Sequence, residues 1–496
     1  MSYEKTVKNY KYKKPKRVNK FNTELCNDKM TFQECELAVL RQAVDEAEEL
    51  HAKSISNNEE VKKMIEILED FLIRKKCICY GGTAINNILP KHAQFYDQEL
   101  EIPDYDFYSP NAMDDAKELA DLYFEAGFKE IEAKAGMHHG TYKVFVNFIP
   151  IADLTYLHPD LFKSIGKEAI TVKGIKYAPP NFLRMNMFIE LSRPAGDVSR
   201  WEKVMKRLTL LNKYYKLDAK NCSQVEFQRK MESYANKSEV LYFTLRDLLI
   251  DHDVVFLGGY ATRLYSRHMP NHDNEIAKKI PDFDVISDNA ESVATIAIDR
   301  LKDLGFNKAK VVKHEGFDEI IPPNYEIRVG TETLAFIYEP IACHSYNKIR
   351  IKDMDIKVAT IDTMLNFYLA FYYSNESYHP KNRIMCMSKF LFDVEAKNRL
   401  EQKGLLKRFS IDCIGTQPTL DSIRSEKVKK FKELKDKRNT REYDEWFLKY
   451  AYSDGKFMGQ KPTEKKEKKE KKTTKNNKTK KKSMNSVING FKTLFE

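Results

Sequence analysis

The first regular pattern along the chain is a helical spacing of apolar residues. Residues 58–74 place apolar side chains three or four positions apart, which predicts an amphipathic helix. An earlier segment begins with Thr31 and Glu34, the two residues of an N-terminal capping box, and continues with apolar residues at the same spacing. We therefore expect residues 1–75 to form a helical N-terminal region.

Short apolar strands alternate with helices after residue 76. Gly81-Gly82 stands between an expected strand and an expected helix. The elements predicted in this part are a strand at 77–80, a helix at 84–89, a strand at 105–108, a helix at 113–126, a hairpin around 136–140, and a strand from Tyr142 to Leu154 that includes Asp153. A helix over NFLRMNMFIELSRP and a basic helix from Ser199 follow.

The second half of the chain repeats this order. A strand at 254–257 runs into Gly258-Gly259, and IPDFD at 280–284 matches IPDYD at 102–106. The distance from glycine to aspartate is 23 residues in the first copy and 24 in the second. Further along, the pattern predicts a helix over 290–304 and a strand over 325–338. We interpret the repeat as a duplication of a whole domain, because its period is far longer than that of a solenoid.

The fold class that follows is α+β with a domain duplicated in tandem. We expect a helical region over 1–75, a first domain over 76–235, a degenerate second domain with C-terminal helices over 236–455, and a lysine-rich, disordered tail over 456–496.

The chemistry of the first copy centres on Asp104 and Asp106. Alternate residues of a strand face the same side, so both carboxylates point into one cleft while Tyr105 and Phe107 anchor the strand. Two carboxylates this close repel each other, and a hard divalent cation removes the conflict. Asp153, on a later strand, supplies a third carboxylate. Three acids of this kind suit two Mg²⁺ or Mn²⁺ ions.

The glycine turn suits a phosphate. Gly81 and Gly82 allow backbone N–H groups to come close to an anion, and the helix that follows presents its N-terminus. Thr83 adds a hydroxyl. A lone D-x-D or a lone Gly-Gly is a weak signal, but strand, turn, helix, strand and a later acid together predict a triphosphate site.

Charge and cysteine content limit the remaining choices. Residues 461–482 hold 12 lysines and 3 glutamates, a net charge of +9, which leaves +2 of the total +11 for the rest of the chain. The lysine-rich segment is either a solubilising end or a loose contact with a polyanion. The eight scattered cysteines include no C-x-x-C pair, so we expect free thiols in a reducing compartment and no structural zinc. We expect neither a secretory signal nor a transmembrane helix.

These motifs resemble those of the polymerase-β-type nucleotidyltransferases, whose signature is a GG[ST] turn, a D-x-D strand and a distant third acid. Within that superfamily the chain is similar to the poly(A) polymerase catalytic subunits of large DNA viruses, of the mimivirus kind and more distantly the poxvirus kind. The resemblance extends through FLRMNMFIELSRPAGDVSRWEKVMKRL at 182–208. It implies metal-binding catalytic acids at Asp104, Asp106 and Asp153, and a nucleotide-phosphate turn at Gly81, Gly82 and Thr83.

The resemblance also implies the reaction: template-independent transfer of AMP from ATP to an RNA 3′-hydroxyl. It favours nucleotide contacts in the segment around the basic helix, at Ser192, Arg193, Ser199, Arg200 and Lys203, where Lys206 and Arg207 share the helix face of Lys203. A solvated helix face is the alternative. Expected partners are ATP and an RNA 3′ end, with a homodimer or a viral processivity partner. The implied location is the virion and the host cytoplasm, at the viral factory.

The second copy lacks one acid. Aligning 142–153 with 325–336 puts Phe336 where Asp153 stands, and Tyr260 replaces Thr83. We therefore expect a catalytically inactive copy that packs against the first and shapes an RNA groove. Three rivals remain: uridylyl, CCA or oligoadenylate transfer, a non-catalytic RNA-binding processivity subunit, and a D-x-D glycosyltransferase.

Overall fold

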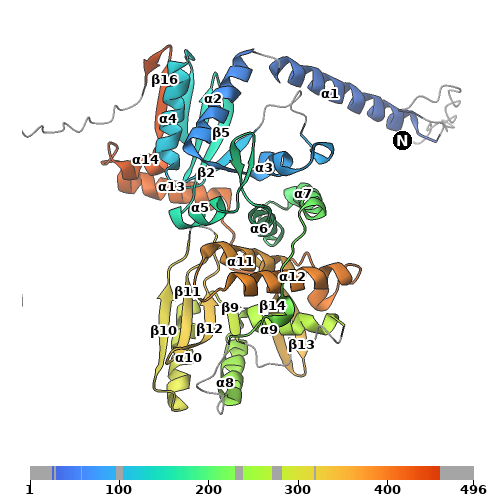
Figure 1. The fold of residues 1–496 in the computed structure, drawn as a ribbon, viewed down its shortest axis with the longest axis vertical. Coiled ribbons are helices and arrows are strands. Elements are labelled where there is room, and N and C mark those ends of the chain that lie inside the picture. Colours follow the sequence, from blue (N-terminus) through green and yellow to red (C-terminus); the bar gives the residue numbers. More distant parts are fainter. Residues whose placement is uncertain are drawn as a thin grey trace, which may run out of the picture. The chain divides into compact units, whose positions relative to one another are not determined.

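A mixed nine-stranded sheet forms the core of the first half of the chain (Figure 1). The computed structural model describes residues 25–26, 29–56, 59–96, 104–229, 238–270, 282–317 and 320–458. Within these residues the sheet has the order β17-β16-β3-β4-β5-β2-β1-β7-β6. Its strands are β1 Ile78–Tyr80, β2 Tyr105–Ser109, β3 Ile131–Ala135, β4 Thr141–Val146, β5 Ile149–Tyr156, β6 Ile170–Val172, β7 Ile175–Tyr177, β16 Lys449–Ser453 and β17 Lys456–Phe457.

The first half of the chain also contains helices, which apart from α1 pack on this sheet or on each other. They are α1 Phe32–Ser56, α2 Glu59–Lys75, α3 Gly81–Ile88, α4 Ala112–Glu125, α5 Pro159–Gly166, α6 Pro180–Leu191 and α7 Trp201–Tyr214. The amphipathic pattern predicted for 58–74 is confirmed, because α2 buries Met64, Leu68 and Leu72. The capping box at α1 is also present, with the Thr31 backbone N–H donating to Glu34. The apolar side chains of α1, such as Leu37 and Leu40, are exposed.

A second sheet with the same plan occupies the second half. Its order in the described residues is β10-β11-β12-β9-β8-β14-β13-β15. The strands are β8 Val255–Leu257, β9 Phe283–Ile286, β10 Ala309–His314, β11 Asn324–Val329, β12 Glu332–Tyr338, β13 His344–Ile351, β14 Met354–Ala359 and β15 Cys413–Ile414. The helices are α8 Ser238–Asp251, α9 Gly258–Tyr265, α10 Ala290–Asp303, α11 Ile361–Ser374, α12 Lys381–Lys397, α13 Leu420–Leu434 and α14 Arg441–Phe447.

The duplication predicted from the glycine and aspartate motifs is confirmed strand by strand. In both sheets the first strand in chain order (β1 or β8) is antiparallel to the second (β2 or β9), and the second is parallel to the fifth (β5 or β12). The third, fourth and fifth strands (β3–β5 or β10–β12) form an antiparallel meander. The first strand is also parallel to a later strand, β7 in one copy and β14 in the other. The α+β fold class is therefore confirmed.

Two of the predicted long strands are wrong. Residues 142–154 form parts of two strands, β4 and β5, which meet at a tight turn where Asn147 and Phe148 have φ values of 48° and 67°. Positive φ at both central residues is the geometry of a type I′ hairpin turn, which hydrophobic alternation does not show. Residues 325–338 are divided in the same way by Gly330, whose φ is 64°.

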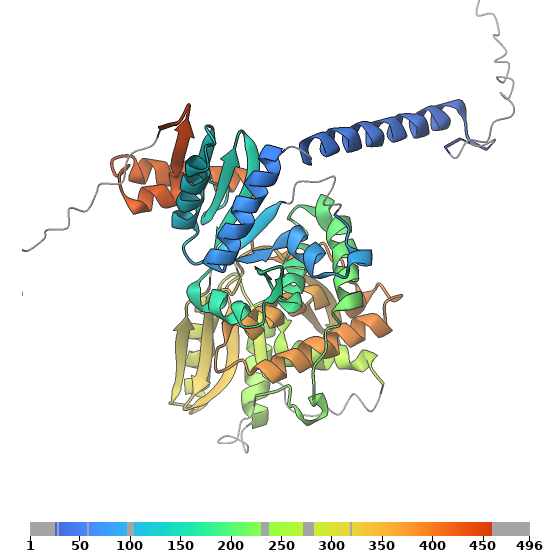
Figure 2. The same cartoon turned by 45° about the horizontal axis from the view of Figure 1, so that its top comes forward.

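The C-terminal part of the chain returns to the first sheet. β16 pairs with β3 in an antiparallel ladder, although some 300 residues separate them (Figure 2). Lys117 of α4 forms an ion pair with Asp444 of α14 at 2.8 Å. The domain limits 76–235 and 236–455 stay a prediction, and residues 449–453 of the second range lie in the first sheet. The segment 461–482 lies outside the described residues.

The two copies contact each other through equivalent helices, α6 and α11. The rings of Phe182 on α6 and Tyr373 on α11 lie edge to face, with centroids 5.3 Å apart. At the end of α6, the backbone N–H of Ser345 on β13 donates to the carbonyl of Ser192 at 2.9 Å. Corresponding elements of the duplicated domain thus pack on one another.

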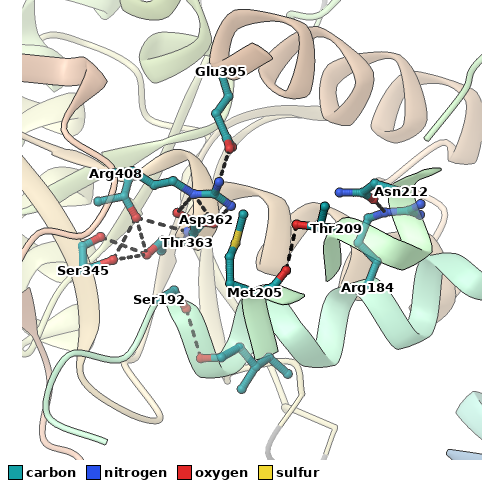
Figure 3. Close-up of polar contacts among 12 residues, drawn as sticks. Arg184, Ser192, Met205, Thr209, Asn212, Ser345, Asp362, Thr363, Glu395 and Arg408 are labelled. Atoms are coloured by element: carbon teal, nitrogen blue, oxygen red, sulfur yellow. Dashed lines mark hydrogen bonds and ion pairs between the residues drawn. The ribbon is translucent and has the colours of Figure 1, made fainter. Parts of the chain in front are cut away.

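A buried ionic cluster lies beside this contact (Figure 3). Arg408 donates to both carboxylate oxygens of Asp362 on α11 and also pairs with Glu395 on α12. The side chain of Asp362 is fully buried. Burial, followed by the charge of Asp362, raises the pKa of Glu395 to about 7, while Arg408 acts in the opposite direction.

The expectation of free thiols is wrong for six of the eight cysteines. Disulfides join Cys26 to Cys35, Cys222 to Cys386 and Cys343 to Cys413, while Cys77 and Cys79 are free and buried. Two of the bonds close separations of 164 and 70 residues. Sequence spacing carries no information about such distant pairs. Within the described residues no helix is long and apolar enough to cross a membrane.

Replacing Glu395 with Gln should flatten the dependence of stability on pH. A carboxyl whose pKa is about 7 when folded and about 4.3 when unfolded binds more protons in the folded state, so its contribution to stability falls as pH rises between these values. We expect thermal unfolding of the Glu395→Gln protein to depend less on pH between 5 and 7 than that of the parent. An unchanged slope would contradict the assignment. Exposed Glu401→Gln is the control.

Candidate active site

Pairing of β2 with β5 brings the predicted acids together. These strands are parallel, and Asp106 stands directly opposite Asp153 in the register. Asp104 immediately precedes β2, on the same face as Asp106. Tyr105 and Phe107, on the opposite face, are 2% and 0% exposed, so they anchor the strand in the core. The tertiary structure therefore places Asp106 and Asp153 side by side on two central strands of the sheet, with Asp104 just before the first of them.

The glycine turn lies against this acid pair. Gly81 has a φ of +72°, and a Cβ atom at this position would stand 2.5 Å from Oδ2 of Asp106. Only glycine allows the backbone to come this close in that conformation. At Gly82 a Cβ atom would stand 2.5 Å from the hydroxyl oxygen of Tyr96. Both glycines are the first residues of α3 rather than a loop before it, so the N-terminus of the helix lies at the acids.

Thr83 has a structural contact in this arrangement. Its side chain is 4% exposed, and its hydroxyl donates to the backbone carbonyl of Asp104 at 2.6 Å. This bond ties α3 to the residue that carries the first acid. The predicted contact between the Thr83 hydroxyl and a phosphate stays a prediction.

The positively charged side chains near the three acids do not fully balance the negative charge of the carboxylates. Burial raises the pKa of Asp106 to about 7, and the charges of Asp104 and Asp153 add to the rise. Burial and then Asp153 also raise the pKa of Asp104. Lys143 on β4 forms an ion pair with Asp153, and its charge opposes both increases. This partial compensation leaves two carboxylates that favour a bound cation.

This donor set fits a hard divalent cation. Carboxylate oxygens on neighbouring strands are the ligands that Mg²⁺ and Mn²⁺ accept, with substrate oxygens and water completing the shell. In the described part of the chain, no three His, Cys, Asp or Glu side chains stand close enough to enclose a metal by themselves.

Basic side chains approach from α7 and the turn before it. The positive charge of Lys203 lowers the pKa of Asp104, and that of Arg200 lowers the pKa of Asp106, in each case against the larger effect of burial. Arg200 also forms an ion pair with Glu190 at 3.0 Å. Lys206, on the same helix, pairs instead with exposed Glu202. The structure therefore separates Lys203 from Lys206.

Arg207 is closer to the glycine turn than sequence spacing indicated. Its Nη2 atom donates to the hydroxyl of Tyr96 at 2.5 Å, and its guanidinium lies 5.3 Å from the ring centroid of Phe95. A Cβ atom on Gly82 would stand 2.9 Å from the same Nη2. The i, i+4 spacing from Lys203 to Arg207 was the available signal, because it puts both side chains on one helix face.

The remaining predicted nucleotide contacts lie elsewhere. Ser192 is fully buried, and its hydroxyl donates to the carbonyl of Ile189 at 3.2 Å (Figure 3). Arg193 lies near buried His344, where its charge adds to the effect of burial and lowers the histidine pKa to about 3. The Ser199 backbone N–H donates to Asp197, which caps the turn before α7. A nucleotide-binding role for these three residues stays a prediction.

The second copy neutralises its aspartates with arginine. The Nε atom of Arg229 lies 2.7 Å from Oδ2 of Asp282, and its Nη2 atom lies 3.0 Å from Oδ1 of Asp284. Arg383 on α12 adds a contact of 3.1 Å to Asp282. Burial opposes ionisation of Asp282, but the two guanidinium groups hold its pKa below the usual value. Two guanidinium groups therefore contact the aspartates that correspond to Asp104 and Asp106 of the first copy.

In the second copy Phe336 takes the place of the third acid of the first copy. It stands opposite Asp284 in the register, as Asp153 stands opposite Asp106. The sequence alignment of Phe336 with Asp153 is therefore confirmed. The ring of Phe336 lies 4.8 Å from the Arg229 guanidinium, a cation–π contact where the first copy has a carboxylate.

Removing Arg229 should destabilise the protein in a pH-dependent way. An Arg229→Met change leaves two buried carboxylates with one partner fewer, which costs about 3–5 kcal/mol. We expect the thermal unfolding midpoint to fall by roughly 5–15 °C at pH 8, and by less at pH 5, because protonation relieves the buried charge. Exposed Arg300→Met is the control. An equal loss at both pH values would contradict the charge argument.

The segment that carries this site is similar to known proteins. The family described as "Poly(A) polymerase catalytic subunit" matches residues 66–197. A protein of African swine fever virus (strain Badajoz 1971 Vero-adapted), provisionally named a poly(A) polymerase catalytic subunit, is 36% identical over 169 residues, which are 33% of this chain and 35% of that protein. An Acanthamoeba polyphaga mimivirus protein with the same provisional name is 30% identical over 225 residues, 44% of this chain and 37% of the relative.

A structural match extends further than the sequence matches. The crystal structure of the Megavirus polyadenylate synthase superposes with a TM-score of 0.71 over 88% of both chains, at 19% identity. The sequence matches span only about a third of the length of the curated relatives. The nucleotidyltransferase fold is therefore shared along most of the chain, and the resemblance to viral poly(A) polymerase catalytic subunits is confirmed for residues 66–197, which carry the glycine turn and all three acids.

Proposed function

We propose that this protein adds AMP from ATP to the 3′ ends of viral mRNA without a template. The observation that carries the proposal is the placement of Asp106 opposite Asp153, with Gly81 in contact with Asp106, inside the segment that matches the poly(A) polymerase family. In the proposed reaction the RNA 3′ oxygen forms a bond to the α-phosphorus of ATP, and pyrophosphate leaves.

The acids and the basic residues have separate tasks in this mechanism. Asp104, Asp106 and Asp153 would hold two Mg²⁺ or Mn²⁺ ions, which when bound stabilise the attacking and leaving oxygens. Gly81 and Gly82 direct the backbone N–H groups at the start of α3 toward the triphosphate. Lys203 approaches Asp104 from α7, where its charge can balance phosphate oxygens.

Substrate and partner choices follow from the same proposal. ATP and an RNA 3′ end are the two substrates, and the neutralised second copy acts as a scaffold rather than a second catalytic centre. RNA is retained by a homodimer or by a separate viral processivity protein. Polyadenylation of viral mRNA would place the protein in virions and in the cytoplasmic viral factory.

Primer extension tests the reaction. Purified protein, a short RNA with a free 3′-hydroxyl, Mn²⁺ or Mg²⁺ and each NTP separately should give long products with ATP alone. An Asp153→Asn change should lower the rate by roughly 1000-fold, because a metal ligand supports several kcal/mol of transition-state stabilisation. Phe336→Leu, at the equivalent register position of the second copy, should leave the rate unchanged.

Other outcomes of that assay select a different function. Extension with UTP, with CTP followed by ATP, or with ATP alone in the absence of a primer would indicate uridylyl, CCA or oligoadenylate transfer, respectively. No extension with any nucleotide, by a protein that binds RNA, would favour the non-catalytic processivity subunit.

Metal binding has its own readout. Mn²⁺ should raise the thermal unfolding midpoint of the parent protein, because an ion that binds only the folded state stabilises it by mass action. An Asp106→Asn protein should show little or no increase. Without metal, the same change should raise the midpoint at pH 8, because it removes a buried carboxyl whose ionised form is unfavourable. A parent protein that is indifferent to Mn²⁺ would contradict the assigned ligands.

A further inference from the structure

A basic cavity lies in the second copy, formed by α8, α9 and the turn between β13 and β14. Its volume is about 440 Å³, within the range of ligand-binding pockets. The lining combines cations with aromatic rings, from Tyr242, Phe243, Arg246, Arg263, Arg267 and Lys352. Among the described residues of the lining, Glu239 is the one acid.

The aromatic wall is partly open to solvent. Phe243 is 47% exposed, so its ring is accessible from solvent at the cavity. The guanidinium of Arg246 lies 4.8 Å from the centroid of the Phe243 ring, and the rings of Tyr242 and Phe243 meet edge to face at 5.2 Å. This arrangement offers flat surfaces on which a nucleobase can stack.

The cationic wall is only partly compensated. Arg246 forms an ion pair with its neighbour Asp247 at 2.6 Å. Arg263 and Arg267 form no ion pair with any carboxylate in the described part of the chain. The charges of Arg246, Arg267 and Arg263 all reach the hydroxyl of Tyr260 and oppose the rise in its pKa that burial causes. Three guanidinium groups therefore converge on one cavity.

The first copy has no equivalent of this charge. Lys76 and Asp253 share a φ of 56° just before β1 and β8, which aligns α2 with α8 and α3 with α9 without a gap. Arg263 then occupies the position of Asn86, whose side chain accepts from the backbone N–H groups of Phe95 and Tyr96 at 2.7 and 2.9 Å. In the second copy this structural amide is replaced by a cation.

Arg246 is another position at which the second copy carries a cation and the first copy does not. It corresponds to Glu69, which accepts a hydrogen bond from the Tyr105 hydroxyl at 2.5 Å. An acid and an amide of the catalytic copy thus correspond to two arginines of the inactive copy, and both arginines line the cavity. Such a change is typical of a surface that meets an anion.

We propose that this cavity binds single-stranded RNA, with Arg263 and Arg267 on phosphates and a base stacked on Phe243. The inference rests on the proposed polyadenylation and assigns part of RNA retention to the inactive copy. A nucleoside triphosphate is the less suitable occupant, because Glu239 is the one carboxylate among the described lining residues and a lone carboxylate does not hold the divalent cation that a triphosphate carries. A duplex does not present base faces to aromatic side chains.

Binding of a labelled, unstructured 20-nucleotide RNA, followed by fluorescence anisotropy without ATP or metal, tests the proposal. Arg263→Ala with Arg267→Ala should weaken binding about tenfold and lower the slope of log K against log salt by about 1.4, because each lost phosphate contact on a single strand contributes about 0.7. Phe243→Ala should weaken binding about tenfold and leave the slope unchanged, because stacking releases no counterions.

The control removes the same charge elsewhere on the second copy. Arg300→Ala with Lys302→Ala, at the exposed end of α10, should change affinity by less than twofold. Equal losses in the two double variants would overturn the proposal in favour of diffuse attraction. Equal competition by double-stranded RNA would overturn the single-strand assignment, and unchanged RNA binding with loss of ATP binding would make the cavity a nucleotide site.

The experiment separates this inference from the proposed reaction. If the cavity variants bind RNA normally while the parent protein extends primers, the RNA site is wrong and the polymerase stands. If the cavity variants lose RNA binding while the parent extends no primer, the site stands and the polymerase is wrong. Unfolding midpoints within 2 °C of the parent would show that lost binding is not lost folding.

Discussion

Repulsion between two carboxylates one residue apart on a buried strand is the constraint on which both copies depend. The ladder that joins the second and fifth strands holds each pair against the sheet, with Asp106 half-buried in the first copy and Asp282 and Asp284 buried in the second, so each copy needs a source of positive charge. In the first copy Lys143 supplies part of it, and the pKa of Asp106 remains high. In the second copy Arg229 and Arg383 supply it permanently.

This difference separates carboxylates that are free to bind an added cation from carboxylates that arginine already neutralises. A mobile cation with open coordination positions can bind and activate substrate, whereas a guanidinium held by two carboxylates cannot leave or exchange ligands. Buried arginine also explains why the aspartates persist in a copy without a third acid. Loss of either one would leave an unpaired charge in the interior, which costs more than keeping the pair.

The double glycine persists for a related reason. Gly258 has a φ of +67°, and a Cβ atom there would collide with the carboxylate of Asp284, just as one on Gly81 would collide with Asp106. The turn is thus required by the close approach of the first helix to the second strand, whether or not a phosphate binds. A Gly-Gly motif in this fold therefore indicates a close approach of the helix to the second strand. Only the balance of charge at the neighbouring carboxylates indicates a catalytic site.

The amino-acid sequence by itself determined most of the local elements and the duplication, and it singled out the three acids that the fold brings onto neighbouring strands. These follow from short-range patterns: helical periodicity, alternation along a strand, and the recurrence of IPD-x-D at a constant distance from a glycine pair. Tight turns escaped this reasoning, because Asn147 and Phe148 adopt a left-handed backbone conformation that apolar alternation does not encode.

Only the tertiary structure decided which distant residues meet. Arg229 and Arg383 reach Asp282 from 53 and 101 residues away, disulfides join six scattered cysteines, and β16 completes the first sheet from the far end of the chain. The cavity of the second copy is of the same kind, since α8, α9 and the turn after β13 each supply one part of its lining. Contacts of this kind depend on which surfaces of helices and strands pack together. The sequence predicts which residues share a surface, but not which other surface they contact.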